Sequence, residues 1–158
     1  MPDALLWDAV CALLPDRVAP GGAAEPLDVL DIGGGTGGLA VPLAVLGHRV
    51  TVVDTSPDAL AALASRARES GVEGRLDARQ GDADDLQVEP ASFDLALCHG
   101  LLEHVDDPAR ALGGIARALR PGGRLSLVVA QRSAAVVAAA LGGHLVRAQA
   151  LLDDPAGQ

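Results

Sequence analysis

The stretch VLDIGGGTGG, residues 29–38, decides the fold of this chain. The apolar run from Leu27 to Ile32 predicts a short strand that leads directly into a cluster of glycines. Glycines allow a tight turn and let the backbone approach a ligand without Cβ clashes. A helix is expected from Thr36 to Leu46, and its first turn offers free N–H groups to a ligand.

Outward from this stretch, strands and helices alternate along the chain. Further strands are predicted at 49–54, 76–80, 93–98 and 124–130, and further helices at 3–14, 57–70, from Asp107-Pro108 onward, and at 133–152 with a break at Gly142-Gly143. Most strands are apolar without alternation, which indicates a sheet covered by helices on both faces. We therefore expect an α/β fold, a Rossmann-like doubly wound sheet of five parallel strands with its ligand at their carboxyl ends.

A single domain is expected over residues 1–158, because neither a linker nor an internal repeat occurs. Residues 1–26 would form an N-terminal helix and a connector, with a Pro/Gly/Ala-rich stretch from residue 15. Residues 27–130 would form the cofactor-binding βα units, and residues 131–158 a C-terminal helical segment.

The composition excludes several classes of protein. Hydrophobic residues make up 49% of the 158 residues but aromatic residues only 1%, so the core must be built from Ala, Leu and Val. The net charge of −9 and the lack of aromatic platforms argue against a non-specific nucleic-acid binder. The high hydrophobic content also argues against disorder.

The N-terminus lacks the basic and apolar pattern of a signal peptide, and no apolar run reaches the roughly 18 residues that a membrane span needs. Cys11 and Cys98 form no C-x-x-C pair, so neither a disulfide scaffold nor a zinc ribbon is indicated. A cytoplasmic protein without a metal site is the resulting expectation.

The glycine loop fits two ligand-binding patterns. Gly33, Gly35 and Gly38 satisfy the dinucleotide pattern G-x-G-x-x-G, whereas Asp31, Gly33, Gly35 and Gly37 satisfy D-x-G-x-G-x-G, found in enzymes that bind S-adenosylmethionine (SAM). A plain strand-to-helix turn is a third interpretation. Asp31 favours SAM, because a carboxylate would repel a pyrophosphate but attract the ammonium and sulfonium groups of SAM.

Two further acids follow later strands. Asp54 ends the second strand and could accept hydrogen bonds from both ribose hydroxyls of an adenosyl ligand, which suits NAD and SAM equally. Asp82 could accept from an adenine amino group while the Ala83 N–H faces a ring nitrogen. Taken alone, Asp54 could instead be a helix cap, and Asp82 part of an acidic turn.

The segment CHGLLEHV, residues 98–105, follows the fourth strand and holds two histidines and a glutamate. His99 is the better placed histidine, because it stands at the carboxyl end of a central strand. Glu103 and His104 are further candidates for acid–base chemistry, but none of the three is assigned a catalytic role. The spacing H-x-x-x-E-H lacks further clustered ligands for a metal.

Over residues 27–130 the chain resembles the class I SAM-dependent methyltransferases. The matching segments, in the family's order, are VLDIGGGTGG (29–38), VTVVDTSPDAL (50–60), GDADDL (81–86), FDLALCHGLLEHVDDP (93–108) and LRPGGRLSLVV (119–129). The resemblance implies that Asp31 and the glycines hold the methionine end, Asp54 the ribose and Asp82 the adenine, with His99 near the sulfonium. The implied cofactor-binding residues are Asp31, Ile32, Gly33, Gly34, Gly35, Gly37, Asp54, Thr55, Asp82, Ala83, Cys98 and His99.

In finer detail, CHGLLEHV-x-DP and LRPGG-x-LSL are similar to the subgroup of the bacterial tRNA 5-carboxymethoxyuridine methyltransferase. Relative to that subgroup we expect the chain to be shortened at both ends and to lack the usual terminal β-hairpin of strands six and seven. We therefore expect the edge of the 124–130 strand to be covered by the final helix, by a second chain, or by residues outside this sequence.

The expected function is methyl transfer from SAM, with S-adenosylhomocysteine (SAH) as product, to oxygen or nitrogen of a small molecule or a modified nucleoside. A non-catalytic or incomplete SAM/SAH-binding module is one alternative, and an NAD-linked oxidoreductase is another. Neither membrane binding nor extended nucleic-acid binding is expected, while a homodimer through the open sheet edge or the C-terminal helix is compatible with the sequence.

Overall fold

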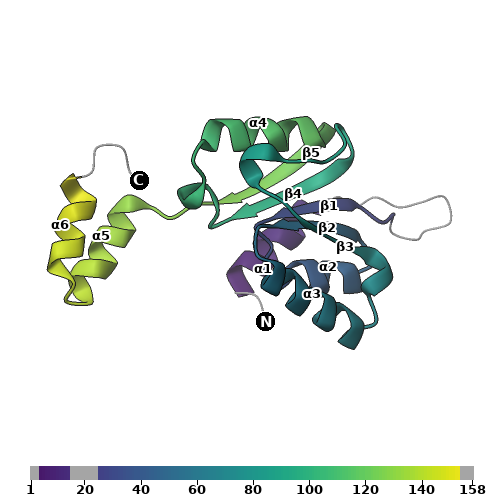
Figure 1. Ribbon diagram of the computed structural model, residues 1–158, viewed down its shortest axis with the longest axis horizontal. Coiled ribbons are helices and arrows are strands. Elements are labelled where there is room, and N and C mark those ends of the chain that lie inside the picture. The colour runs from purple at the N-terminus through teal and green to yellow at the C-terminus, as the bar shows by residue number, and fades with distance from the viewer. Residues whose placement is uncertain (1–3, 15–24, 154–158) are drawn as a thin grey trace.

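The computed structural model describes residues 4–14 and 25–153, and its centre is a parallel sheet (Figure 1). The sheet has the order β3-β2-β1-β4-β5 and every neighbouring pair is parallel. The strands are β1 (Asp28–Ile32), β2 (Arg49–Asp54), β3 (Leu76–Gln80), β4 (Phe93–His99) and β5 (Leu119–Val128). The predicted α/β fold with five parallel strands is confirmed. Most of the predicted connector and the last five residues of the predicted C-terminal segment lie outside the described residues.

Helices cover both faces of the sheet. The described residues form six α-helices, which are α1 (Ala4–Leu13), α2 (Ala40–Val45), α3 (Pro57–Glu69), α4 (Pro108–Ala118), α5 (Arg132–Leu141) and α6 (Leu145–Asp153). Helices α1, α2 and α3 pack on one face in a core that includes Val10, Leu43 and Leu63, and α4 packs on the other face through Ala111 and Ile115 (Figure 1). None of the described helices is both long and apolar enough to cross a membrane.

Two helices begin as their sequence signals predict. The Ser56 hydroxyl accepts a hydrogen bond from the Ala59 N–H at 3.2 Å, and the Asp107 carboxylate accepts one from the Arg110 N–H at 3.0 Å. In both cases the next residue is a proline, whose fixed φ suits the first helical position. These caps fix where α3 and α4 leave the carboxyl edge of the sheet.

Two boundaries differ from the prediction. Helix α2 begins at Ala40 rather than Thr36, because Gly37 has a φ of 79° that a right-handed helix cannot include. Strand β5 begins at Leu119 and continues through Pro121-Gly122-Gly123, which was predicted to be a turn. The pairing with β4 is irregular between Phe93 and Leu95, so the extra residues form a bulge rather than ending the strand.

The C-terminal segment breaks at Gly142-Gly143 as predicted, and Gly143 has a φ of 78°. Helices α5 and α6 pack against each other and stand apart from the sheet (Figure 1). Within the described residues the final helix therefore does not cover β5. The first of the three expectations for that edge is wrong. Leu127, Val128 and Val129 are exposed there. Coverage of the β5 edge by a second chain, or by residues outside this sequence, stays a prediction.

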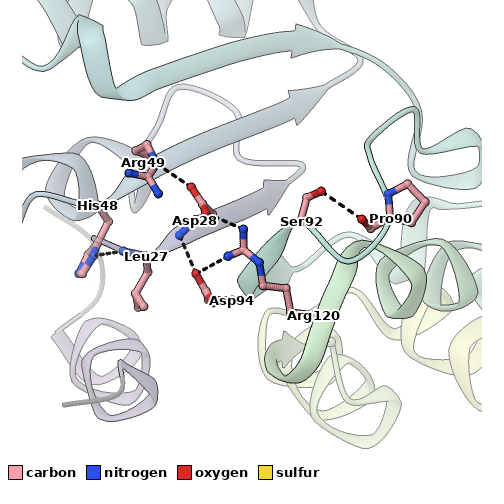
Figure 2. Close-up of polar contacts among 8 residues, drawn as sticks. All are labelled: Leu27, Asp28, His48, Arg49, Pro90, Ser92, Asp94 and Arg120. Atoms are coloured by element: carbon pink, nitrogen blue, oxygen red, sulfur yellow. Dashed lines mark hydrogen bonds and ion pairs between the residues drawn. The ribbon is translucent and has the colours of Figure 1, made fainter. Parts of the chain in front are cut away.

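An ion-pair network ties the strands together at the amino edge of the sheet (Figure 2). The Arg120 guanidinium donates to Asp94 Oδ2 at 2.7 Å and to Asp28 Oδ2 at 2.9 Å, and Arg49 Nε donates to Asp28 Oδ1 at 2.7 Å. Burial opposes ionisation of Asp28, but the hydrogen bonds from Arg49 and Arg120 outweigh it and lower the pKa of Asp28. The network therefore joins β1, β2, β4 and β5 opposite the expected ligand edge.

We predict that Arg120→Met lowers the free energy of unfolding by about 1–3 kcal/mol, because it leaves two part-buried carboxylates without their shared cation. The matched control is Arg79→Met, which removes the more exposed ion pair with Asp77 and should cost less than about 1 kcal/mol. Urea denaturation at pH 7 measures both changes. Equal losses in the two variants would show that Arg120 does not hold the strands together.

Candidate functional site

The glycine loop leaves β1 and crosses toward β2. The Gly33 N–H donates to the Val53 carbonyl at 2.8 Å, which extends the β1–β2 pairing by one residue into the loop. Gly33 and Gly35 have φ values of 70° and 53°, so the loop takes a left-handed path that residues with side chains rarely adopt. Its backbone therefore lies over the carboxyl end of the sheet.

Gly34 rests directly on the buried carboxyl group of Asp31. A Cβ at Gly34 would lie 2.5 Å from Asp31 Oδ2 and 2.9 Å from Val52 Cγ1, closer than real Cβ contacts allow. A Cβ at Gly37 would likewise collide with the Leu63 side chain. The glycines at these two positions are therefore required by close approach, and the loop forms a cradle over Asp31.

Asp31 is an acid in an apolar place. Only 5% of its surface is exposed, and burial, with a smaller contribution from the charge of Asp54, raises the pKa of Asp31 to about 7. A cationic group near the loop would favour the charged form of this carboxyl. The site therefore carries an acid that suits a ligand with a positively charged end.

Asp54 joins the glycine loop to the beginning of α3. Its Oδ2 accepts from the Gly35 N–H at 2.8 Å, and its Oδ1 accepts from the Ser56 N–H at 2.9 Å. Each carboxylate oxygen can accept more than one hydrogen bond. Asp54 is thus fixed by two backbone bonds and retains capacity to accept hydroxyl groups from a ligand.

The loop after β3 approaches the same place. The Gly81 N–H donates to the Asp54 carbonyl at 3.1 Å, and the Asp82 carboxylate accepts from the Asp84 N–H at 3.0 Å, which begins the short helix η2 (Ala83–Asp85). Asp84 Oδ2 accepts from the Asp106 N–H at 3.1 Å and so links this loop to the one after β4. Asp82 is therefore both an exposed acceptor and the cap of its own turn.

These segments enclose one cleft at the carboxyl edge. Six of the sequence-predicted residues line it, and five further residues do so without having been proposed as binding residues. The predicted residues are Ile32, Gly33, Asp54, Thr55, Asp82 and Ala83, and the others are Val53, Gly81, Leu101, His104 and Val105. Asp31, Gly34, Gly35 and Gly37 belong to the cradle rather than to the cleft walls.

Leu101, His104 and Val105 reach the cleft from the loop after β4, which contains the short helix η3 (Leu102–His104). Their segment was recognised in the sequence, but its apolar residues gave no separate signal. Such residues are the usual lining of a small-molecule site, where a few polar groups set orientation. The cleft thus pairs apolar walls with the carboxylates of Asp54 and Asp82.

Cys98 and His99 end β4 beside the cleft. Cys98 is fully buried, belongs to the core on the α4 face, and has a pKa raised by burial, so its thiol is a packing group. His99 is half-buried, and its Nε2 lies 2.8 Å from Ser126 Oγ on β5. Burial lowers the pKa of His99, which keeps the imidazole neutral at pH 7.

The arrangement suits an organic ligand rather than a metal ion. Among the described residues, no three His, Cys, Asp or Glu side chains come close enough together to hold a metal. The cleft and cradle offer a buried acid, two carboxylates and apolar walls. They can bind a molecule that has a cationic end, neighbouring hydroxyl groups and a flat apolar part.

Asp31 makes the stability of the ligand-free chain depend on pH. In the unfolded chain its carboxyl ionises near 3.8, whereas the folded state keeps the proton up to about pH 7. The folded state therefore binds more protons between these values, and the contribution of Asp31 to stability falls as the pH rises through this range.

We predict that Asp31→Asn is more stable than the wild type at pH 8, by about 2–4 kcal/mol, and that the difference shrinks toward pH 4. Urea denaturation of both proteins at pH 4, 6 and 8 measures it, with Asp77→Asn as an exposed control. If the stability difference between wild type and Asp31→Asn does not change with pH, burial does not raise the pKa of Asp31 in the folded chain.

The sequence matches the family described as "Methyltransferase domain" over residues 30–127. The chain is 40% identical over 116 residues to the "Ubiquinone biosynthesis O-methyltransferase" of Xanthomonas euvesicatoria pv. vesicatoria, a match that covers 73% of this chain and 48% of the relative. The chain spans about half the length of the curated relatives it matches.

Solved structures with a similar fold include a SAM-dependent methyltransferase from Mesorhizobium loti and the [4+2]-cyclase SpnF. The first has a TM-score of 0.63 and 30% identity, and the match covers 77% of this chain and 52% of that one. The second has a TM-score of 0.61 and 32% identity, and the match covers 75% and 43%.

Proposed function

This chain belongs to the methyltransferase domain family, whose cofactor is SAM, and on that premise we propose that it moves a methyl group from SAM to a hydroxyl group of a small molecule. One observation carries the proposal. A cleft walled by Asp54 and Asp82 adjoins a glycine cradle that covers the buried acid Asp31. Each part of this arrangement matches a different part of SAM.

Each group of residues in the site can be assigned to one part of SAM. Asp54 would accept the ribose hydroxyls, and Asp82 with the Ala83 N–H would hold the adenine between the apolar walls. The loop and Asp31 would hold the methionine end, because its ammonium and sulfonium charges compensate a carboxyl in an apolar site. SAM supplies a methyl group on a positively charged sulfur, which a nucleophile can displace.

The contribution of the protein to methyl transfer would be alignment. The fixed Asp54 and the narrow cradle hold one reactant in a single orientation, so that an acceptor at the open side meets it in line. The apolar walls exclude water that would compete as a nucleophile. His104 is the cleft's imidazole and could order a polar group of the acceptor.

The similarity to enzymes named for ubiquinone biosynthesis supports O-methylation of a small molecule. The finer resemblance to the tRNA 5-carboxymethoxyuridine subgroup leaves a modified nucleoside as a second acceptor class. A net charge of −9 disfavours that class, since RNA would be repelled. SpnF is named a cyclase, so the shared fold does not by itself require methyl transfer. A non-catalytic or incomplete SAM/SAH-binding module is therefore the alternative.

An NAD-linked activity agrees less well with the site. A pyrophosphate bound at the glycine loop would lie over Asp31, and the acid of Asp54 is already close to the same loop. The Asp54 carboxylate, and Asp31 in its charged form, would repel a doubly charged diphosphate. Competition between SAH and NAD for the chain separates the two cofactors.

We predict that SAH binds the chain and that Asp54→Ala weakens this binding by about 1.5–3 kcal/mol, roughly 10-fold to 150-fold, because charged hydrogen bonds to the ribose are lost. Calorimetry with SAH and with NAD measures the affinities, and Asp77→Ala, an exposed acid on β3, is the matched control. Equal SAH affinity in wild type and Asp54→Ala, or binding of NAD in preference to SAH, would contradict the proposed site.

The same proteins test catalysis when they are given SAM labelled on its methyl group. Label should appear in small hydroxylated aromatic compounds, and this signal should fall with Asp54→Ala but not with Asp77→Ala. Label that appears only in bulk tRNA would favour the modified-nucleoside acceptor. SAH binding without label in any acceptor would favour the non-catalytic module.

A further inference from the structure

The residues at the carboxyl edge form a row across the sheet. The cleft takes its residues from the ends of β3, β2 and β1 and from the loop after β4. Beyond β1 the row continues to His99 on β4 and to Ser126 on β5, two residues that do not line the cleft. This part of the edge has no assigned role in the proposed binding of the nucleoside.

Strand pairing places His99 and Ser126 on the same face of the sheet as Asp31. Asp31 pairs with Leu97, Leu97 pairs with Ser126, and His99 follows Leu97 by two residues. Paired residues of parallel strands point to the same face, and so do residues two apart. The pair therefore lies on the same face of the sheet as the acid that would face the cationic end of the cofactor.

Ser126 fixes the His99 ring. Its hydroxyl lies 2.8 Å from His99 Nε2, and only 8% of the serine surface is exposed. The neighbours of Ser126 on β5 are Leu125 and Leu127, so this serine stands between two apolar residues of the strand. Burying a hydroxyl group costs free energy unless the group makes a hydrogen bond, and Ser126 makes this bond to His99.

The other ring nitrogen is left without a partner. His99 Nδ1 is buried, and among the described residues only Asp84 Oδ1 shares this condition of a buried side-chain atom without a hydrogen bond. Leaving such an atom unpaired destabilises the folded chain, and native proteins keep few of them. An unpaired nitrogen beside a ligand edge indicates that a ligand supplies the missing bond.

We propose that Ser126 is a positioning residue that holds the His99 imidazole so that Nδ1 binds the hydroxyl group of the methyl acceptor. This inference rests on the proposed function and adds a requirement to it: the acceptor must present a hydrogen-bonding hydroxyl on the β4–β5 side of the glycine loop. The neutral ring offers Nδ1 as acceptor while its Nε2–H is donated to Ser126 Oγ. This hydrogen bond would fix the orientation of the acceptor hydroxyl before methyl transfer.

The test uses the ¹⁵N-labelled chain saturated with SAH, with phenol as the hydroxyl probe and fluorobenzene as a probe of similar size that cannot donate. Phenol should shift the His99 Nδ1 resonance, and fluorobenzene should not. In Ser126→Ala the apparent phenol affinity should fall about 3-fold to 10-fold, and Ser126→Thr, which keeps the hydroxyl, should restore it. The SAH affinity should stay within about 2-fold in both variants.

Ser92→Ala is the matched control, because Ser92 also uses its hydroxyl in a hydrogen bond, to the Pro90 carbonyl at the opposite edge (Figure 2). It should change neither affinity. A loss of SAH affinity in Ser126→Ala would assign Nδ1 to the cofactor and overturn the inference, as would equal shifts from both probes or none from phenol. If wild type fails to bind SAH, the proposed function fails instead.

Discussion

The parallel pairing of β1 on both sides is the constraint on which the site depends. Residues 28–32 pair with β2 and residues 29–32 pair with β4, so three strands end at one edge within a residue of each other. The chain then has to leave β1 through a loop confined between its two neighbours. Only a glycine-rich loop can follow this path, because Gly34 lies on Asp31 and Gly37 lies on Leu63.

Acidic residues have opposite environments at the two edges of the sheet. At the amino edge Asp28 and Asp94 are paired with Arg120, which favours the charged form of Asp28 and joins the strands. At the carboxyl edge Asp31 is buried, and the charge of another acid, Asp54, adds to the effect of burial in raising its pKa. The amino edge therefore contributes stability, while the carboxyl edge keeps unpaired polar groups that a ligand can compensate.

The succession of strands and helices along the chain could be predicted from the sequence, because strand and cap signals are local. The caps at Ser56 and Asp107 and the break at Gly142-Gly143 depend on neighbouring residues alone. The late beginning of α2 depends on the φ values of the loop, and the length of β5 depends on its pairing with β4 across the bulge. Neither boundary could be predicted from a local sequence pattern.

The same distinction applies to the candidate site. The acids and glycines carry a motif, and six of the twelve proposed residues line the cleft. Leu101 and Val105 look like ordinary apolar residues, and Ser126 is 27 positions from its partner His99, so only the fold brings them to the site. Cys98 follows the motif but points into the core, because side chains alternate along β4.

A crystal structure of the chain with SAH would show where the ligand binds. We expect a ribose within hydrogen-bond distance of Asp54, an adenine beside Asp82 and Ala83, and the homocysteine end over the loop that covers Asp31. SAH bound elsewhere, or with its ribose turned away from Asp54, would contradict the proposed SAM site.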